Sequence, residues 1–189
     1  SRAKHHTGAR RSAQTLGIMK PPIQPYKRSI WTHDARYDLP SAGFAPQESI
    51  VIARLMSVDS AKKQVPPIPP MQLLQISALA KKLPPAQSAT KRDVEDYLSA
   101  RHQLFGAGIA VMICMLSVES NGDYPPMDRK FAAGMRARGK IDQTQESSLT
   151  SPSDTDFAAV YVEKIIPAWH ESRLTRTPKE ADDYWGSSE

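Results

Sequence analysis

Residues 90–139 constrain the fold more than any other part of the chain. A polar segment with helical spacing, TKRDVEDYLSARHQ, runs through LFGAG into the almost wholly apolar segment IAVMICMLSVES. A turn signal at Asn121-Gly122 follows, and Asp128 then opens a basic segment that ends before Gly139. An apolar run of this length is typical of a helix at the centre of a helical domain. We therefore expect three consecutive helices with the apolar one buried.

The rest of the chain also has helical rather than strand periodicity. Apolar spacing predicts helices over residues 47–58, 71–83 and 156–174, and a last helix that begins at Pro178 after the capping residue Thr177. Thr90 and Asp93 have the spacing of a capping box, and Pro167 should kink the helix that contains it. The serine-rich residues 142–156 are expected to form a surface loop, and no β-hairpin signal is present. The predicted fold class is all-α, with one domain over residues 30–189.

The positive charge is concentrated at the N-terminus. Residues 1–33 contain seven Lys and Arg residues and no acid, which leaves 18 of the 25 basic residues and all 20 acids for the remainder. Residues 1–29 also contain Pro21, Pro22 and Pro25, so we expect a flexible basic arm. Such an arm suits a polyanion, because lysine and arginine release counterions from phosphates. A solubilising tail explains the same composition equally well.

Several classes of protein are excluded or disfavoured by composition. The longest apolar run, residues 106–116, is too short to cross a membrane, and the N-terminus lacks the apolar stretch of a secretory signal. The single cysteine, Cys114, cannot form an internal disulfide and is expected to be a small core residue. His5 and His6 lack further ligands, so no metal site is predicted. We expect a cytoplasmic protein, a monomer with no membrane partner.

The segment LFGAG joins two predicted helices through a glycine hairpin. Gly106 and Gly108 allow backbone conformations and close approaches that a Cβ would prevent. The backbone N–H groups that open the following helix then form a binding site for phosphate. Taken alone, the short pattern fits an ordinary corner between helices better than a phosphate site.

The order and spacing of the motifs favour a more specific interpretation. LFGAG, then IAVMICMLSV, then PPMD with Asp128 twenty residues after Gly108 resembles the helix-hairpin-helix DNA glycosylases, the superfamily of endonuclease III and the 8-oxoguanine glycosylases. The resemblance covers about a quarter of the chain. A weaker likeness is carried by residues 176–186, RTPKEADDYWG, which are similar to the closing helix of bacterial relatives of the 8-oxoguanine enzymes.

The resemblance implies that Asp128 is the catalytic carboxylate. Cleavage of an N-glycosidic bond develops positive charge on the sugar, which a fixed carboxylate stabilises while it orients or deprotonates the attacking water. Asp128 is equally suited to cap a helix after two prolines, and both roles are compatible.

Other residues acquire roles from the same resemblance. The DNA backbone would be held by the hairpin and the start of the basic helix: Phe105, Gly106, Ala107, Gly108, Ile109, Arg129 and Lys130. A solvated helix face explains Arg129 and Lys130 about as well. Four aromatic residues are candidates for stacking on a flipped base or filling its gap, with core packing as the alternative: Tyr124, Trp31, Trp169 and Trp185.

Three departures from the family pattern narrow the predicted chemistry. Ala110 stands where lyase-competent members carry the lysine that forms a Schiff base, so a monofunctional enzyme is expected. One cysteine cannot hold an iron–sulfur cluster, which leaves at most a monovalent cation at the hairpin. Phe105 replaces the usual hairpin proline, and it either packs under the hairpin or alters its contact with DNA.

The sequence therefore predicts a monofunctional DNA glycosylase. It would flip a damaged or modified base out of double-stranded DNA and excise it by hydrolysis, leaving an abasic site with the strand intact. The biological role could be the repair of damaged bases or the removal of modified bases from phage DNA, and the sequence does not decide between them. Two alternatives are a non-catalytic helix-hairpin-helix module that binds DNA and a helical interaction protein without a nucleic-acid role.

Overall fold

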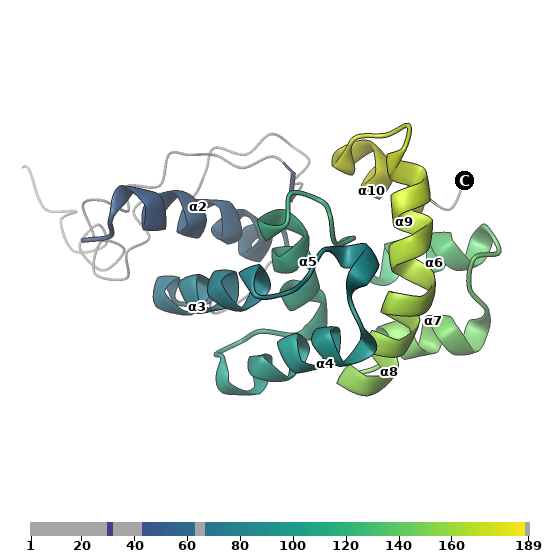
Figure 1. Ribbon diagram of the computed structural model, residues 1–189, viewed down its shortest axis with the longest axis horizontal. Coiled ribbons are helices and arrows are strands. Elements are labelled where there is room, and N and C mark those ends of the chain that lie inside the picture. Colours follow the sequence, from purple (N-terminus) through teal and green to yellow (C-terminus); the bar gives the residue numbers. More distant parts are fainter. Residues whose placement is uncertain (1–29, 32–42, 63–66, 188–189) are drawn as a thin grey trace, which may run out of the picture.

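The computed structural model describes residues 30–31, 43–62 and 67–187, and within these ranges the protein is all-helical with no β-strand (Figure 1). The predicted all-α class is therefore confirmed. The basic arm, residues 1–29, lies outside the described residues, as do most of the loop before the first helix and residues 63–66.

The α-helices follow one another through short connections. They are α2 (Pro46–Ala61), α3 (Pro70–Lys81), α4 (Lys91–Ser99), α5 (Ile109–Glu119), α6 (Arg129–Ala137), α7 (Gln143–Thr150), α8 (Asp154–Val160), α9 (Ile166–Arg173) and α10 (Pro178–Gly186). Two 3₁₀ turns, η2 (Ala86–Ser88) and η3 (Ala100–Gln103), lie on either side of α4, and the π-helical turn η4 (Tyr161–Ile165) lies between α8 and α9.

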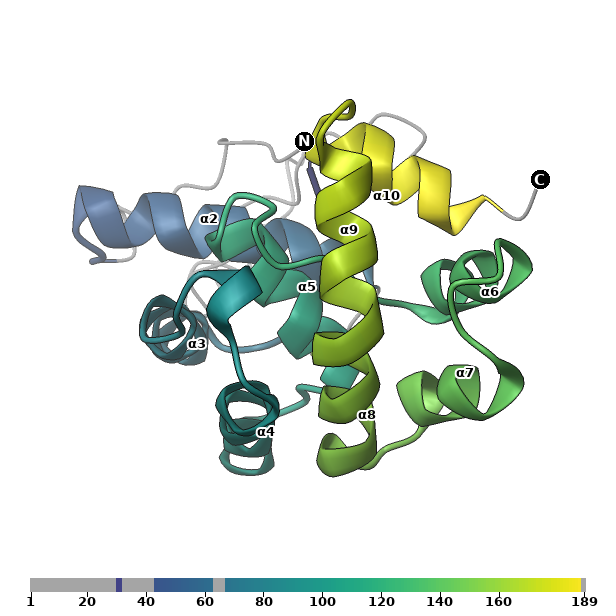
Figure 2. The ribbon, with the colours of Figure 1, turned by 45° about the vertical axis from the view of Figure 1, so that its right-hand side comes forward.

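Helix α5 forms the centre of the molecule. Every residue from 111 to 118 is buried, as its all-round apolar sequence predicts. Helices α2, α3 and α4 pack on one side of α5, whereas α6 and α7 lie on the far side of the α8–α9 rod (Figures 1 and 2). The start of α5 lies close to the second group of helices, because Gly108 and Ile109 line a pocket together with Asp128 and Leu149.

Side-chain caps fix where the later helices begin. Thr90 accepts a hydrogen bond from the Asp93 N–H in a capping box, and Thr177 does the same with Glu180 ahead of Pro178. Both helix starts were predicted from the sequence. These caps satisfy amide groups that have no partner inside their own helix.

The predicted loop over residues 142–156 is wrong in its first half. Helix α7 begins there with a capping box in which Asp142 accepts from the Gln145 N–H, and its only buried residue is Leu149. A short polar helix with one core contact has almost no apolar periodicity, so capping and not hydrophobic spacing marks its start.

Pro167 does not produce the expected kink. A proline inside a helix lacks an N–H and clashes with the carbonyl four residues earlier. Here the π turn η4 ends at Ile165, two residues before the proline, and a widened turn accommodates this mismatch. Helices α8 and α9 consequently continue as one rod (Figure 2).

Helices α6 and α10 approach each other through a glycine. A Cβ on Gly134 would lie 1.6 Å from the Trp185 carbonyl oxygen, so no larger residue fits without displacement. This contact fixes α6, and therefore Asp128 at its start, relative to the C-terminal helix. No helix in the described ranges has the length and apolar character needed to cross a membrane.

Candidate functional site

One open pocket brings together the hairpin and Asp128. It has a volume of about 330 Å³ and lies where the first turns of α5 and α6 meet the connection between α7 and α8. Gly108, Ile109 and Ala110 line it from α5, and Asp128 and Arg129 line it from α6. These segments are separated by about twenty residues in the sequence, and the fold brings them to one pocket.

The hairpin reaches the pocket through a left-handed glycine. Gly106 has a φ of +73°, which a residue with a Cβ adopts only with strain. The Phe105 N–H donates to Gln72 Oε1 at 2.8 Å, which ties the hairpin to α3. The Phe105 side chain is 52% exposed, so it does not pack under the hairpin.

Helix α5 begins without a side-chain cap. Gly108 is its N-cap residue in extended backbone conformation, and no side chain of the described residues caps the first turn. The unpaired N–H groups and the positive end of the helix dipole therefore face the pocket edge formed by Gly108, Ile109 and Ala110. This arrangement favours an anion.

Asp128 has the opposite character at the start of α6. Its Oδ1 accepts from the Phe131 N–H at 2.9 Å, which makes Asp128 the N-cap predicted from the sequence. Its Oδ2 lies 3.2 Å from the Nζ of Lys62, and the Asp128 side chain is 45% exposed. The helix thus fixes one oxygen of the carboxylate and leaves the group at the surface of the pocket.

Lys62 was not predicted as a site residue. It directly follows α2, and its N–H donates to the Val58 carbonyl in a continuation of the last helical turn. Partial burial lowers the pKa of the amine, whereas the adjacent Asp128 carboxylate raises this pKa and favours the charged form. Lys62 is therefore an ammonium group at neutral pH. No spacing rule connects it to Asp128, because only the tertiary packing of α2 brings them together.

A second carboxylate lies near this pair. Asp182 of α10 accepts a hydrogen bond from Trp31 Nε1 at 3.2 Å. Burial raises the pKa of Asp182 to about 6, against the lowering effect of the Trp31 hydrogen bond and with a further increase from the charge of Asp128. Asp182 was not predicted as a site residue, because it is an ordinary acidic residue in the second turn of α10.

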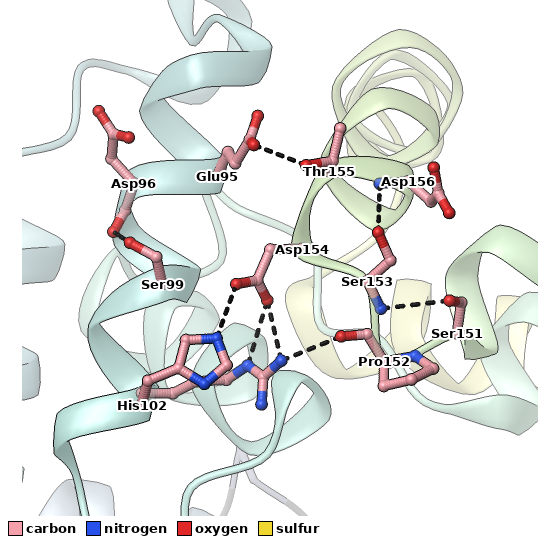
Figure 3. Close-up of polar contacts among 11 residues, drawn as sticks. Glu95, Asp96, Ser99, His102, Ser151, Pro152, Ser153, Asp154, Thr155 and Asp156 are labelled. Carbon is pink, nitrogen blue, oxygen red and sulfur yellow. Dashed lines mark hydrogen bonds and ion pairs between the residues drawn. The ribbon is translucent and has the colours of Figure 1, made fainter.

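An ion-pair cluster fixes another wall of the pocket (Figure 3). Arg101 Nε lies 3.1 Å from Asp154 Oδ1, and the same guanidinium donates to the Pro152 carbonyl at 3.0 Å. His102 Nε2 lies 3.2 Å from Asp154 Oδ2. Since Arg101 and Pro152 both line the pocket, the cluster ties the end of the hairpin's first helix to the α7–α8 connection. Arg101 was not among the predicted residues.

The structure separates the predicted backbone-binding residues into two groups. Gly108, Ile109 and Arg129 line the pocket with Asp128. Four others lie outside its lining, on the hairpin or on the exposed side of α6: Phe105, Gly106, Ala107 and Lys130.

Three of the four candidate aromatic residues need correction, because they are core residues. Tyr124, Trp169 and Trp185 are at most 3% exposed. Each directs its polar group to an internal acceptor: Tyr124 to the Pro84 carbonyl at 2.6 Å, Trp169 to the Gly122 carbonyl at 2.8 Å and Trp185 to Ser172 Oγ at 3.1 Å. Trp31 is half-buried and stacks on Trp169 with ring centroids 6.4 Å apart. Large aromatic side chains bury much apolar surface when they pack in a core, and core packing is the role that these three residues have.

Among the residues in the described ranges, no group of three or more His, Cys, Asp or Glu side chains is arranged to hold a metal ion.

No family model matches the chain, and no curated protein or solved structure matches it.

The arrangement has a definite chemical capacity. Uncapped amide groups and the guanidinium of Arg129 offer positive potential to an anion, while Asp128 supplies a fixed negative charge in the same pocket. A substrate that carries a negative group beside a centre of developing positive charge fits both features.

Proposed function

We propose that the protein is a monofunctional DNA glycosylase that excises a damaged or modified base from double-stranded DNA by hydrolysis. The observation that carries this proposal is the shared pocket of Asp128 and the uncapped start of α5. A nucleotide has the matching charge pattern, because its phosphate is anionic and its sugar becomes cationic as the glycosidic bond breaks.

The start of α5 would hold a backbone phosphate. Gly108 has no Cβ, and nothing lies within 4 Å of the position a Cβ would take, so this part of the backbone is accessible from outside. No side chain in the described part of the chain caps the N–H groups that follow Gly108. Phosphates bind such helix starts through backbone hydrogen bonds and the helix dipole. A monovalent cation at the hairpin carbonyls would add to this contact.

Asp128 would act on the sugar of the extruded nucleotide. The hydrogen bond from the Phe131 N–H fixes the carboxylate relative to α6, so little reorganisation is needed when positive charge develops opposite it. The same group can orient or deprotonate the attacking water. Preorganised carboxylates of this kind contribute through charge stabilisation rather than through binding of the ground state.

Water is the proposed nucleophile. Ala110, the second residue of α5, lines the pocket, and its methyl group offers no amine. The product is then a free base and an abasic site in an unbroken strand. The proposal places this activity in the cytoplasm on a monomer, in repair or in defence against phage DNA with modified bases.

The experiment is a base-release assay on duplexes that carry a panel of modified bases. Wild-type protein and Asp128→Asn are incubated with each duplex, and samples are then heated with alkali to cut abasic sites. We expect alkali-dependent cutting of at least one duplex by the wild type and none by Asp128→Asn.

Three other results are informative. Salt-dependent DNA binding without release from any duplex would replace the enzyme by a non-catalytic DNA-binding module. Strand breaks without alkali would contradict the hydrolytic mechanism. The absence of DNA binding at any ionic strength would leave only the interaction-protein alternative.

A further inference from the structure

We infer that Lys62 is a phosphate-binding residue that the free protein holds on Asp128, and that DNA binding transfers its ammonium from this carboxylate to a backbone phosphate. The inference rests on the proposed function, since it concerns the same site. Lys62 would cover one carboxylate oxygen of Asp128 in the free protein and would uncover it only when a polyanion is bound.

Both carboxylate oxygens of Asp128 are occupied in the free protein. Oδ1 accepts from the Phe131 N–H at 2.9 Å, and Oδ2 lies 3.2 Å from Lys62 Nζ. The Phe131 contact belongs to the cap of α6 and persists as long as the helix does. Oδ2 is therefore the oxygen that a substrate must use.

The Lys62 ammonium occupies the position that a cationic sugar requires. An ammonium group and a sugar with oxocarbenium character are both cations that gain stability next to the same carboxylate oxygen. They cannot lie on Oδ2 together without like-charge repulsion. Reaction therefore requires the Lys62–Asp128 pair to open.

Lys62 leaves Asp128 as a cation and needs an anion to receive it. The Asp128 carboxylate at 3.2 Å favours the charged form of Lys62, so Lys62 does not depart as a neutral amine. Among its neighbours, Cys114 is buried and its pKa is raised, so it remains a neutral thiol. Asp182 already accepts from Trp31 Nε1, and its burial disfavours ionisation. The anion that arrives with the substrate is phosphate.

The pair has the exposure expected of a contact that exchanges. The side chain of Lys62 is 21% exposed and that of Asp128 is 45% exposed, so solvent screens their attraction. The flexible stem of lysine lets its ammonium move by several ångströms while the backbone stays hydrogen-bonded to Val58. A phosphate bound at the start of α5 would attract the ammonium toward the pocket.

The first test measures the salt dependence of binding to a duplex that contains a stable neutral abasic analogue. Binding of wild type, Lys62→Gln, Lys62→Arg and the control Lys179→Gln is measured across a range of KCl concentrations. Lys179 is a suitable control because it is also a lysine paired with a carboxylate, Asp183 at 2.8 Å, on the surface of α10. The plot of log K against log salt has a negative slope. We expect Lys62→Gln to make this slope shallower by about 0.9, the value for one phosphate, and we expect the other variants to keep the wild-type slope.

The second test asks whether the phosphate contact is coupled to Asp128. Asp128→Asn releases Lys62 from its partner, so it should strengthen DNA binding several-fold in the wild-type background. In the Lys62→Gln background the same substitution should give at most the small gain expected from removing one negative charge. Equal gains in both backgrounds would overturn the transfer from Asp128 to phosphate.

The third test separates this inference from the proposed function. On a duplex whose base is released, single-turnover rates at saturating DNA should be no lower for Lys62→Gln than for wild type. A fall of more than about tenfold, or a borohydride-stable adduct between Lys62 and abasic DNA, would show that Lys62 takes part in the chemistry and would overturn the inference. If no base is released at all, the proposed function fails, while the salt slope still decides whether Lys62 binds phosphate. An unchanged slope in folded Lys62→Gln would overturn the inference regardless of activity.

Discussion

Two helix N-termini border the same pocket, and they differ in the residue at the N-cap position. Helix α5 begins at Gly108 with no side-chain cap among the described residues, whereas α6 begins at Asp128, whose carboxylate accepts from the Phe131 N–H. The first start therefore presents unpaired donors to an anion, and the second presents a carboxylate. One local device, the N-terminus of a helix, thus gives opposite charges within one pocket, and the choice depends on a single residue at each start.

The difference also shows why the two residues respond differently to substitution. Gly108 contributes by lacking a side chain, so any capping residue would close its site. Asp128 contributes a charge in addition to a cap, so the two contributions can be separated by replacing the charge alone.

The largest expected effect comes from separating the two roles of Asp128. Asparagine caps a helix about as well as aspartate, so Asp128→Asn should change the free energy of unfolding by less than about 0.5 kcal/mol while base release falls at least about 100-fold. Asp128→Ala removes the cap as well and should also cost about 1 kcal/mol of stability. Urea unfolding and single-turnover assays on the three proteins measure both quantities. Full activity of Asp128→Asn would contradict a catalytic role and leave Asp128 with the helix cap as its function.

Gly134 tests whether the position of α6 depends on α10. A Cβ at this residue would lie 1.6 Å from the Trp185 carbonyl oxygen, so Gly134→Ala must displace one of the helices. We expect a loss of about 2 kcal/mol or more, in the range of overpacked core substitutions. Gly186→Ala is the matched control, because nothing lies within 4 Å of its added Cβ. Equal melting temperatures for the two variants would contradict the close approach of α6 and α10.

Asp59 provides a buried carboxylate to compare with the half-exposed Asp128. Its Oδ2 accepts from the Ile68 N–H at 3.0 Å, while its buried Oδ1 has no hydrogen-bond partner among the described residues. Burial raises the pKa of Asp59 to about 6, only partly opposed by the Ile68 hydrogen bond.

The sign of the effect follows from the higher pKa in the folded state. The folded protein binds a proton more tightly than the unfolded chain, so this group makes the protein less stable as the pH rises from about 4 to 6. Asp59→Asn should therefore be more stable than wild type at pH 7, by up to about 3 kcal/mol, and this gain should disappear near pH 4. Chemical unfolding at both pH values measures it. A gain that is the same at pH 4 and pH 7 would contradict ionisation as the cause.

The smallest effect comes from giving α5 the cap that it lacks. Nothing lies within 4 Å of a Cβ built on Gly108, and its extended backbone suits serine, so Gly108→Ser should fit and stabilise the protein by a few tenths of a kcal/mol. Its hydroxyl would occupy a first-turn N–H, and DNA affinity should fall about three- to tenfold. Gly108→Ala, which adds a Cβ without an acceptor, is the control for binding. An unchanged affinity of Gly108→Ser would show that these amide groups do not hold phosphate.

Features that depend on neighbouring residues could be predicted from the sequence. The starts of α4, α6 and α10 follow from capping side chains within three residues of each start, and the burial of α5 follows from its composition. In each case the signal lies within one or two elements.

Features that depend on packing between distant elements could not be predicted. Lys62 reaches Asp128 only because α2 packs on α5, and 66 positions separate the pair in the sequence. Arg101 is fixed by Asp154, which is 53 positions away. The aromatics Tyr124, Trp169 and Trp185 have the same local pattern whether they face a pocket or the core, so burial had to come from the structure.

The most direct test of the central claim compares two abasic analogues in otherwise identical duplexes. One carries a neutral tetrahydrofuran sugar and the other a cationic pyrrolidine sugar, which has the positive charge of the proposed transition state. The comparison does not require the identity of the excised base. If Asp128 stabilises a cationic sugar, wild-type protein should bind the cationic analogue at least about tenfold more tightly, and Asp128→Asn should lose this preference. Equal affinity of wild-type protein for the two duplexes would contradict the catalytic role of Asp128.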